Sequence, residues 1–402
     1  MDRAGGCRDT LRWMSTVELP QGFSAHVANV GIKDTTDDFV VVASDVPCAA
    51  AAVFTRSRFA GPSVEVSRRH AADGSLQAVV VVSKNANVAT GPVGLEHAEE
   101  LAAGVATAIG CDADGVLVTS TGVIGRRYPM DRIRAHLSTL TGPFDRTDAV
   151  AVATGMMTTD TFAKTASATV GDGPGAARVV GVAKGVGMIE PDMATMLAFV
   201  FTDAEVDAAD LDGITRTVTE RTFNSLSVDT DTSTSDTFAV LANGRAGRVP
   251  LDELSAAIES VCTDLTRQLA RDGEGATKLL LVDVTGARDD DQARRVAKTV
   301  LNSPLVKTAV HGADPNWGRV AMAIGKCSDD TDIDPERVTI RFGGDEVYPT
   351  PITDAELAEL ETYLKGDEVV IAVDLGISDA SWRVYGCDLS DGYVRINADY
   401  TT

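Results

Sequence analysis

The chain has 402 residues, which favours two domains, and its 44% hydrophobic and 24% charged residues are ordinary for a globular protein. The formal net charge of −23 argues against binding to nucleic acid or to an anionic membrane, because both need a basic face. No stretch approaches the roughly 18 uninterrupted apolar residues of a membrane span, and residues 1–13 lack the apolar core of a signal peptide. We therefore expect a cytoplasmic protein in which residues 1–13 form a disordered extension.

The first half alternates β-branched runs with an alanine-rich helical stretch. A helix is expected at 95–110, ending at Gly110. An early apolar run includes 40–42, and strands are expected at 78–83, 115–125, 178–189 and 194–204. The segment 115–125 runs into a glycine-bearing loop, and 178–189 runs into a glycine-rich turn.

The second half continues the alternation. Helices are expected at 212–226, 251–273 with Gly273 as the cap, 292–301 and 354–364. Strands are expected at 279–286, 320–326, 337–342, 368–376 and 382–389. The run ARDDD at 287–291 interrupts the pattern. The sequence therefore predicts the α/β (α+β) class, with a larger domain at 14–288 and a smaller C-terminal α/β domain at 289–402.

Several common catalytic arrangements are missing from the sequence. The six cysteines form no CxxC pair and the five histidines no HExxH motif, so we expect reduced thiols and no metal site. Neither GxSxG nor GxxxxGK[ST] occurs, and GVGMIE at 185–190 is only part of the GxGxxG pattern.

Thr195 stands at an unusual junction. It opens an apolar run shortly after Pro191, whose ring fixes a sharp turn. If the backbone there is strained, the Thr195 hydroxyl can attack the carbonyl of Ala194, and hydrolysis of the resulting ester leaves a new N-terminal threonine. Its α-amine, with an ordinary pKa of about 7.7–8.0, could then take the proton of its own hydroxyl. A β-branched residue opening a strand is the ordinary alternative.

The segment STGVIG at 120–125 supplies two donors suited to an oxyanion. These are the hydroxyl of Thr121 and the unobstructed backbone N–H of Gly122. The same segment also fits a simple glycine turn after a strand, so both interpretations stay open.

Long motifs in a fixed order resemble the ornithine acetyltransferase (glutamate N-acetyltransferase) family of arginine biosynthesis, from about Gly22 to Thr402. The motifs are KNANVATG (84–91), STGVIG (120–125), MTTDT (157–161), AKGVGMIEPDMATML (183–197), FNSLSVDTDTSTSDT (223–237), DGEGATK (272–278), NSPLVKTAVHGADPNWGR (302–319) and YVRINADYTT (393–402). The resemblance implies a layered α/β sandwich of the N-terminal-nucleophile type and a reaction without a cofactor.

The resemblance also implies residue roles. Cleavage between Ala194 and Thr195 would release Thr195 as nucleophile, with Thr121 and Gly122 as the oxyanion hole. The substrate-binding positions it implies are Thr158 or Thr159, Lys184, Thr195, Glu274, Asn397 and Thr402. The α and β chains made from one precursor would assemble as α2β2 or larger.

Each binding residue also has an ordinary explanation. Lys184 can pair with a substrate carboxylate, but most lysines lie on the surface. Glu274 can hold an ammonium group of ornithine, or it can be a plain carboxylate at a helix end. Asn397 and Thr402 require a docked tail, whereas chain ends are commonly loose.

Two further motifs have open interpretations. The acidic run at 229–237 is a solvated loop, or its carboxylates recognise the substrate ammonium. The run HGADPNWGR at 311–319 is a buried structural loop, or it lies beside the active site with Asn316 and Arg319 binding a partner chain or substrate.

The predicted reaction is ping-pong transfer of acetyl from N-acetylornithine to Thr195 and then to glutamate. One rival is an N-terminal-threonine amidase or aminopeptidase of the same fold, and another is an unprocessed metabolite-binding or scaffold protein. The use of acetyl-CoA, the choice between primary and specialised metabolism, and the size of the oligomer stay open.

Overall fold

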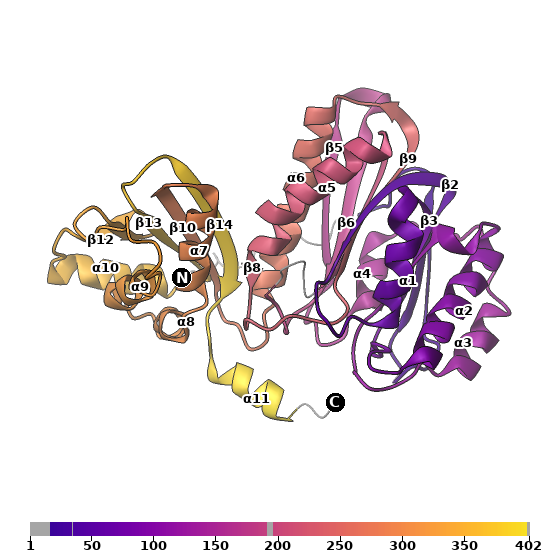
Figure 1. Cartoon of the computed structure of the whole chain (residues 1–402), viewed down its shortest axis with the longest axis horizontal. Helices are drawn as coiled ribbons and strands as arrows, with labels where there is room; N and C mark the ends of the chain where they lie inside the picture. Colours follow the sequence, from indigo (N-terminus) through magenta and orange to yellow (C-terminus); the bar gives the residue numbers. More distant parts are fainter. Residues whose placement is uncertain (1–16, 34, 191–195, 400–402) are drawn as a thin grey trace, which may run out of the picture.

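The computed structural model describes residues 17–33, 35–190 and 196–399. The predictions for residues 1–13, Ala194, Thr195 and Thr402 lie outside these described residues. Within them the chain forms an eight-stranded and a six-stranded sheet, and α11 (Asp391–Asp399) lies below and between the two (Figure 1).

The larger sheet has the strand order β4-β3-β2-β9-β7-β6-β5, and β1 pairs with β2 off this path. Its strands are β1 (Phe23–Ala28), β2 (Phe39–Phe54), β3 (Ser75–Val82), β4 (Val116–Ser120), β5 (Lys164–Val170), β6 (Ala177–Lys184), β7 (Leu197–Glu205) and β9 (Thr237–Arg248). The strands β4, β6 and β7 are buried along almost their whole length, which explains why their sequences are nearly continuous apolar runs.

The long strand β2 folds this sheet into two stacked halves. Its register against β3 shifts between Ala43 and Cys48, and such an irregularity bends a strand. The first half of β2 pairs with β1 and β3, and the second half pairs with β9. Val79 of β3 and Phe199 of β7 belong to one buried cluster although their strands are not neighbours in the sheet. The two halves therefore pack face to face as a sandwich.

Helices cover both outer faces of this sandwich (Figure 1). They are α5 (Ala208–Arg221) and α6 (Leu251–Arg271) on the β5–β6–β7–β9 half, and α1 (Pro62–His70), α2 (Pro92–Ile109) and α3 (Met130–Leu137) on the β3–β4 half. A further helix, α4 (Ala149–Met156), contributes to the cluster between the halves. The sequence of layers, helix, sheet, sheet, helix, confirms the predicted layered α/β sandwich.

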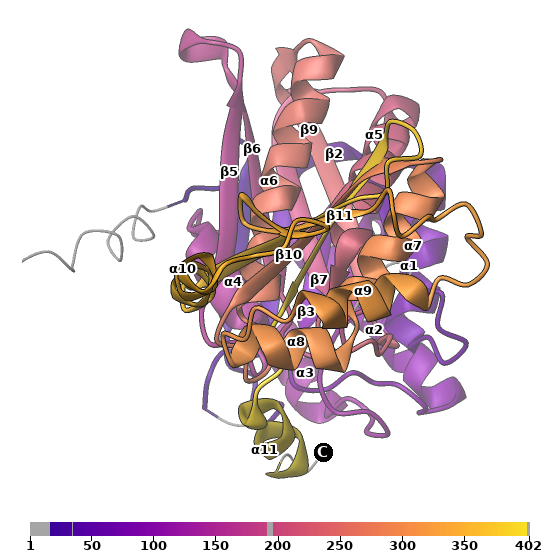
Figure 2. The same cartoon turned by 90° about the vertical axis from the view of Figure 1, so that its left-hand side faces the viewer.

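The smaller sheet has the order β12-β11-β13-β10-β14-β8. Its elements are β8 (Leu226–Ser227), β10 (Leu279–Ala287), β11 (Thr339–Phe342), β12 (Asp345–Tyr348), β13 (Glu368–Asp374) and β14 (Ala380–Cys387), with helices α7 (Asp290–Leu301), α8 (Pro304–His311), α9 (Trp317–Gly325) and α10 (Asp354–Leu364). Figure 2 shows α8, α9 and α10 in front of this sheet. β8 precedes 287–291 and β10 ends at Ala287, the first residue of that run, and the domain boundary there stays a prediction.

Most predicted elements are confirmed, but the strand predicted at 320–326 is wrong. That segment lies in α9, whose buried residues are Val320, Ala323 and Ile324. Their spacing of three and four residues is that of a helix face, and a seven-residue apolar run cannot be assigned by periodicity alone. The helix predicted at 212–226 also ends early, at Arg221, and is followed by a 3-10 turn, Phe223–Ser225, and β8.

The predicted glycine cap of α6 is also wrong. Asp272 caps the helix, and Gly273 is not left-handed. A Cβ on Gly273 would lie 2.7 Å from Cys387 Sγ, so the glycine is needed for close packing between α6 and β14.

Three other 3-10 helices lie in the connections, at Ala71–Asp73, Ala113–Gly115 and Gly173–Gly175. The five cysteines in the described ranges are all free. No helix in those ranges combines the length and apolar character that crossing a membrane requires.

Candidate active site

Several strands of the larger sheet begin or end at one edge of the sandwich. Leu197, the first residue of β7, lies opposite Lys184, the last residue of β6, and opposite Thr237, the first of β9. Thr237 in turn lies opposite Phe54 at the end of β2. Loop residues from many parts of the chain therefore lie close together at this edge.

Three of the predicted site residues meet at this edge through the amine of Lys184. Its Nζ lies 2.8 Å from Thr158 Oγ1 and 3.3 Å from Thr121 Oγ1. Thr121 directly follows β4, and its backbone N–H donates to the carbonyl of Val82 at 3.1 Å. Thr158 is half-buried, whereas Thr159 is exposed. Lys184 is only 7% exposed, so it is not an ordinary surface lysine.

A buried ionic cluster holds Lys184 in place. Asp160 lies 3.9 Å from Lys184 and 2.8 Å from Lys164 Nζ, and it accepts the backbone N–H of Gly185 at 2.6 Å. Lys164 also contacts Asp272 at 2.5 Å. Burial alone would raise the pKa of Asp160, but the charges of Lys184 and Lys164 and the hydrogen bonds from Lys164 and the Gly185 N–H outweigh burial and hold that pKa at about 2. Burial lowers the pKa of Lys184, and the Asp160 carboxylate opposes this effect.

Gly122 occupies a position that only glycine fits. Its φ is +125°, and an added Cβ would lie 2.3 Å from the carbonyl carbon of Lys84. The loop after β4 thus packs directly on the loop after β3, and an Asn85–Val123 bridge joins them. The segment 120–125 can therefore be a glycine turn and also present an oxyanion donor, because the close contact holds the backbone N–H of Gly122 in one orientation.

Glu274 and Asn397 form a second group across the glycine turn at 185–188. The backbone N–H of Glu274 donates to Val186 at 2.8 Å, and a Cβ on Gly187 would lie 2.4 Å from Glu274 Oε2. Asn397 Nδ2, from α11, donates to Glu274 Oε2 at 2.9 Å. Burial raises the pKa of Glu274, and the hydrogen bond from Asn397 opposes this. The helix that carries Asn397 is thus docked on the turn that follows Lys184.

The segment just before the predicted cleavage site is also anchored. Asn302 Nδ2 donates to Glu190 Oε2 at 2.7 Å, and Lys298 Nζ lies 3.7 Å from Glu190 Oε1. The backbone N–H of Glu190 donates to Asp231 at 2.8 Å. Burial lowers the pKa of Lys298 to about 8, and Glu190 opposes this shift. Lys298 of α7 and Asn302, its C-cap, therefore hold the last described residue before 191–195.

Two aspartates of the acidic run 229–237, Asp229 and Asp236, belong to the folded structure around this edge. Asp229 accepts the backbone N–H groups of Met188 and Ile189, each at 2.7 Å. Asp236 is 2% exposed, and its Oδ2 has no hydrogen-bond partner among the described residues. A solvated loop does not describe these two carboxylates.

The run at 311–319 extends from the end of α8 into the start of α9. His311 Nδ1 lies 2.7 Å from Asp388 Oδ2, Asn316 caps α9, and Trp317 stacks on Tyr348 with ring centroids 5.1 Å apart. Arg319 donates to the carbonyl of Leu305 at 2.8 Å. These contacts join α8, α9 and the smaller sheet, but no residue of the run is buried, so the run is a structural connection and not the buried loop of the first interpretation.

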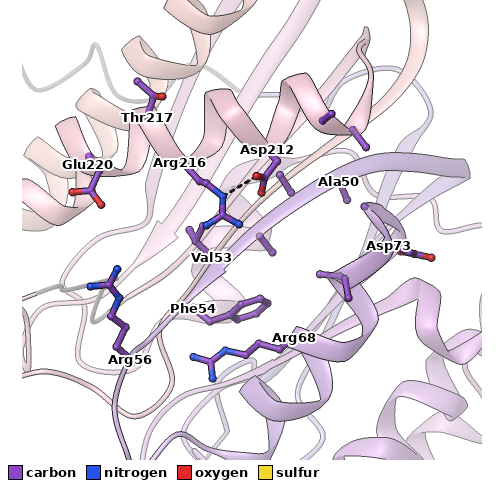
Figure 3. Close-up of a pocket in the computed structure, with 17 residues that line it drawn as sticks. Ala50, Val53, Phe54, Arg56, Arg68, Asp73, Asp212, Arg216, Thr217 and Glu220 are labelled. Carbon is purple, nitrogen blue, oxygen red and sulfur yellow. Dashed lines mark hydrogen bonds and ion pairs between the residues drawn. The ribbon is translucent and has the colours of Figure 1, made fainter.

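A separate groove of about 910 Å³ lies between α5 and α1, over the second half of β2 (Figure 3). Arg216 pairs there with Asp212 at 2.7 Å, and Arg68 lies over the ring of Phe54. None of the described residues predicted for the active site lines this groove.

Sequence reasoning missed Asp160, Lys164, Asp272 and Asp236. Asp160 lies within the motif MTTDT, and Asp236 within the acidic run, so the motifs contained both residues without indicating their burial. Among the residues that the structure describes, no group of three or more His, Cys, Asp or Glu side chains is arranged to hold a metal ion.

Comparison with known proteins gives a consistent result. The family model described as the ArgJ family matches residues 24–402. The chain is 56% identical over 399 residues to glutamate N-acetyltransferase Oat2 of Streptomyces clavuligerus, covering 96% of this chain and 99% of that protein. It is 53% identical over 389 residues to arginine biosynthesis bifunctional protein ArgJ 2 of Nostoc sp., covering 97% and 100%.

A solved structure of arginine biosynthesis bifunctional protein ArgJ from Bacillus halodurans is 43% identical, covers 51% of this chain and 100% of its own, and has a TM-score of 0.48. The predicted resemblance is confirmed by the family match and by the near-complete coverage of the relatives. This protein belongs to the ArgJ family.

Proposed function

We propose that this protein is a self-processing acyltransferase of arginine biosynthesis that moves an acetyl group from N-acetylornithine to glutamate. The single observation that carries the proposal is the convergence of Thr121, Thr158 and Lys184 at the edge where β7 begins. In the sequence Thr195 stands two positions before Leu197, the first residue of β7. Relatives named glutamate N-acetyltransferase and bifunctional ArgJ support the reaction class.

The first step of the reaction is self-cleavage. The Thr195 hydroxyl attacks the carbonyl carbon of Ala194, the amide bond breaks, and water opens the ester to leave chains 1–194 and 195–402. The freed α-amine then serves as the base for the hydroxyl of the same residue.

Acetyl transfer follows in two halves. Thr195 Oγ attacks the acetyl carbonyl, and Thr121 Oγ and the N–H of Gly122 donate to the oxyanion. The amine passes its proton to the leaving nitrogen of ornithine. The α-amine of glutamate then attacks the acetyl-threonine ester and takes up the acetyl group.

Charges at the edge suit the two substrates. The Lys184 ammonium pairs with the α-carboxylate that both substrates carry. Glu274, held by Asn397, faces the ammonium end of ornithine. Thr158 is favoured over Thr159 as the substrate-binding threonine because it contacts Lys184 and is half-buried. We further propose that the two chains assemble as α2β2 or larger in the cytoplasm.

The test combines a gel with an assay. The purified wild-type protein should run as two bands on a denaturing gel, with Thr195 as the first residue of one band. Thr195→Ala should stay a single inactive chain, whereas Thr195→Ser keeps a hydroxyl and should still be cut. A single intact band for the wild-type protein would contradict self-cleavage.

Incubation with N-acetylornithine, with and without glutamate, separates transfer from hydrolysis. Ornithine should appear rapidly only when glutamate is present, because glutamate is the acceptor. Equal release without glutamate would favour the rival amidase or aminopeptidase. A parallel assay with acetyl-CoA and glutamate decides whether the protein also acetylates glutamate directly.

A further inference from the structure

The half-buried carboxyl of Glu274 is held in one position beside the glycine turn at 185–188. Asn397 Nδ2 donates to its Oε2 at 2.9 Å, and a Cβ on Gly187 would lie 2.4 Å from Oε2 and 2.9 Å from Oε1. The backbone N–H of Glu274 donates to the carbonyl of Val186 at 2.8 Å. Because its backbone and its carboxyl both rest on this turn, Glu274 has little room to swing aside for a ligand.

The two substrates of the proposed reaction differ in charge at the end of the side chain. Ornithine carries an ammonium nitrogen four bonds from Cα, and glutamate carries carboxylate oxygens at the same number of bonds. With the α-carboxylate of either substrate on Lys184, the two ends reach the same region. An ionised Glu274 there attracts the ammonium of ornithine and repels the carboxylate of glutamate, so one fixed charge does not suit both substrates.

The charged groups around Glu274 do not remove this conflict. Lys184 of β6 is the cation that acts on its carboxyl, and the proposed function assigns that amine to the α-carboxylate of the substrate. Burial raises the pKa of Glu274, while the hydrogen bond from Asn397 and the charge of Lys184 act against this shift. Asp229, after β8, and Asp160, after α4, add negative charge and raise the pKa further.

The other titratable groups that face Glu274 either keep their charge or act on all amino acids alike. Asp160, with a pKa of about 2, stays ionised near neutral pH. Burial raises the pKa of Tyr393, on α11, to about 12, so its hydroxyl stays neutral. Burial lowers the pKa of Lys184, but this amine meets the α-carboxylate, which every amino acid carries. A change in the charge of Glu274 can therefore be detected by comparing amino acids that differ only at the side-chain end.

The contacts of the carboxyl suit both its ionised and its neutral form. Oε2 can accept the N–H of Asn397 in either form, because a neutral carboxyl keeps an acceptor oxygen. Within the described part of the chain, Oε1 has no hydrogen-bond partner. Oε1 is therefore the oxygen that is placed to gain and lose a proton.

We propose that Glu274 changes its protonation state between the two half-reactions, so that one subsite accepts the cationic end of N-acetylornithine and then the anionic end of glutamate. This inference rests on the proposed function. The ionised carboxylate pairs with the ammonium. When ornithine has left and glutamate binds, Oε1 takes one proton from solvent and its O–H donates to the glutamate carboxylate. The proton returns to solvent when N-acetylglutamate leaves, so the full cycle consumes no proton.

The experiment measures the binding of glutamate, glutamine and ornithine to the purified protein by isothermal titration calorimetry. None of the three carries an acetyl group, so none reacts with the free protein, and glutamine is the neutral match for glutamate. Between about pH 5.5 and 8, the ratio of the Kd for glutamate to the Kd for glutamine should rise at least about tenfold, because only glutamate requires the neutral carboxyl. The Kd for ornithine should fall over the same range, because ornithine binds the ionised form.

Titrations in buffers of different ionisation enthalpy count the protons directly. At about pH 8, glutamate should take up about one more proton on binding than glutamine does. A ratio that stays constant with pH, or equal proton uptake by the two ligands, would overturn the proposal.

Glu274→Gln supplies the variant, since it keeps the shape of the side chain but cannot titrate. Its glutamate-to-glutamine ratio should stay constant with pH, and its Kd for ornithine should rise at least about tenfold at pH 8. The control is Glu346→Gln, because Glu346 is also half-buried but pairs with Arg341 in the smaller sheet, where β12 is the edge strand. The control should keep the wild-type pH dependence, with the melting temperature as the check on folding.

The wild-type measurements stand alone should Glu274→Gln fail to fold, because the ratio and the proton count need no variant. Failure of the proposed function gives a different result. A protein that binds none of the three amino acids would contradict the proposed function and this inference with it. Binding of all three without a pH-dependent ratio would overturn the inference alone.

Discussion

At the residue scale, the site depends on buried ions that constrain one another. Lys164 is fully buried and contacts both Asp160 and Asp272, so it fixes the carboxylate that in turn faces Lys184. Removing one member of such a group leaves an uncompensated charge, which is costly. The cluster therefore stabilises the fold and orients the amine that we assign to substrate binding.

Asp160→Asn tests this dependence. We expect a loss of about 3–5 kcal/mol in the free energy of unfolding, as for other broken buried ion pairs. The folded pKa of about 2 lies below the ordinary 3.8, so this carboxylate stabilises the fold above about pH 4 and loses its contribution as pH falls toward 2. The difference between wild type and variant, measured by denaturant unfolding, should narrow in that window.

The control for this variant is Asp38→Asn. Asp38 is equally buried but accepts the backbone N–H groups of Val30 and Ile32, each at 2.7 Å. Its substitution should cost about 1–3 kcal/mol, as for a lost hydrogen bond to a buried group. Equal losses in the two variants would contradict the special role of the ionic cluster.

Gly122→Ala should impair both folding and acetyl transfer. The left-handed backbone alone costs about 1–2 kcal/mol for a side chain, and the Cβ would collide with the backbone of Lys84. Gly125→Ala is the matched control, because its φ is +85° but no atom lies within 4 Å of its added Cβ. Melting temperature and transfer rate should fall more for Gly122→Ala, and similar losses in both would argue against the close packing of the two loops.

At the scale of elements, sequence patterns predicted most helices and strands but not their partners. The strands at 178–189 and 194–204 were expected from their apolar runs, whereas the bend in β2 that stacks the two halves has no sequence signal comparable in strength. The resemblance named Thr121, Lys184 and either Thr158 or Thr159, and the structure brings Thr121, Thr158 and Lys184 together, while their roles stay predictions. The burial of Asp160 and Asp236 could not be predicted, because it depends on which strands become neighbours. The prediction for α9 was wrong for a similar reason. A short apolar run does not show whether its residues repeat with the period of a helix or of a strand.

The anchoring of Glu190 gives a prediction at this scale. Glu190 lies just before the predicted cleavage site. Glu190→Ala removes its contacts with Lys298 of α7 and with Asn302, the C-cap of α7. With the chain before the predicted cleavage site less restrained, we expect self-cleavage to slow several-fold, measured as the uncut fraction on a denaturing gel. Glu205→Ala is the control, because Glu205 ends β7 on the surface and pairs with Arg248. Equal cleavage in the two variants would contradict a role for the anchor.

At the scale of the whole molecule, α11 connects the end of the chain to the active-site edge. No residue of this helix is buried, yet Asn397 reaches Glu274, and a Cβ on Gly275 would lie 2.2 Å from the backbone nitrogen of Tyr393. The helix thus contributes little to any core while completing the surroundings of Glu274.

Deleting residues 391–402 should therefore separate stability from activity. We expect the melting temperature to change by only about 2–4 °C, since about 1 kcal/mol corresponds to that shift in a protein of this size. Acetyl transfer should fall more than tenfold, with KM for N-acetylornithine raised. Asn397→Ala should move KM in the same direction with a smaller effect. A truncated protein with wild-type KM would show that the helix is not part of the site.

The strand order has a last consequence for a chain cut after Ala194. In the run β2-β9-β7-β6, the outer two strands come from residues 1–194 and the inner two from residues 195–402. The fragments are therefore interleaved within one sheet and cannot part without unravelling it. An uncut precursor refolds at a rate independent of concentration, whereas separated fragments must first collide, so their recovery becomes second order. Cutting thus makes unfolding effectively one-way in dilute solution, and the protein has one opportunity to build this sheet, before the bond breaks.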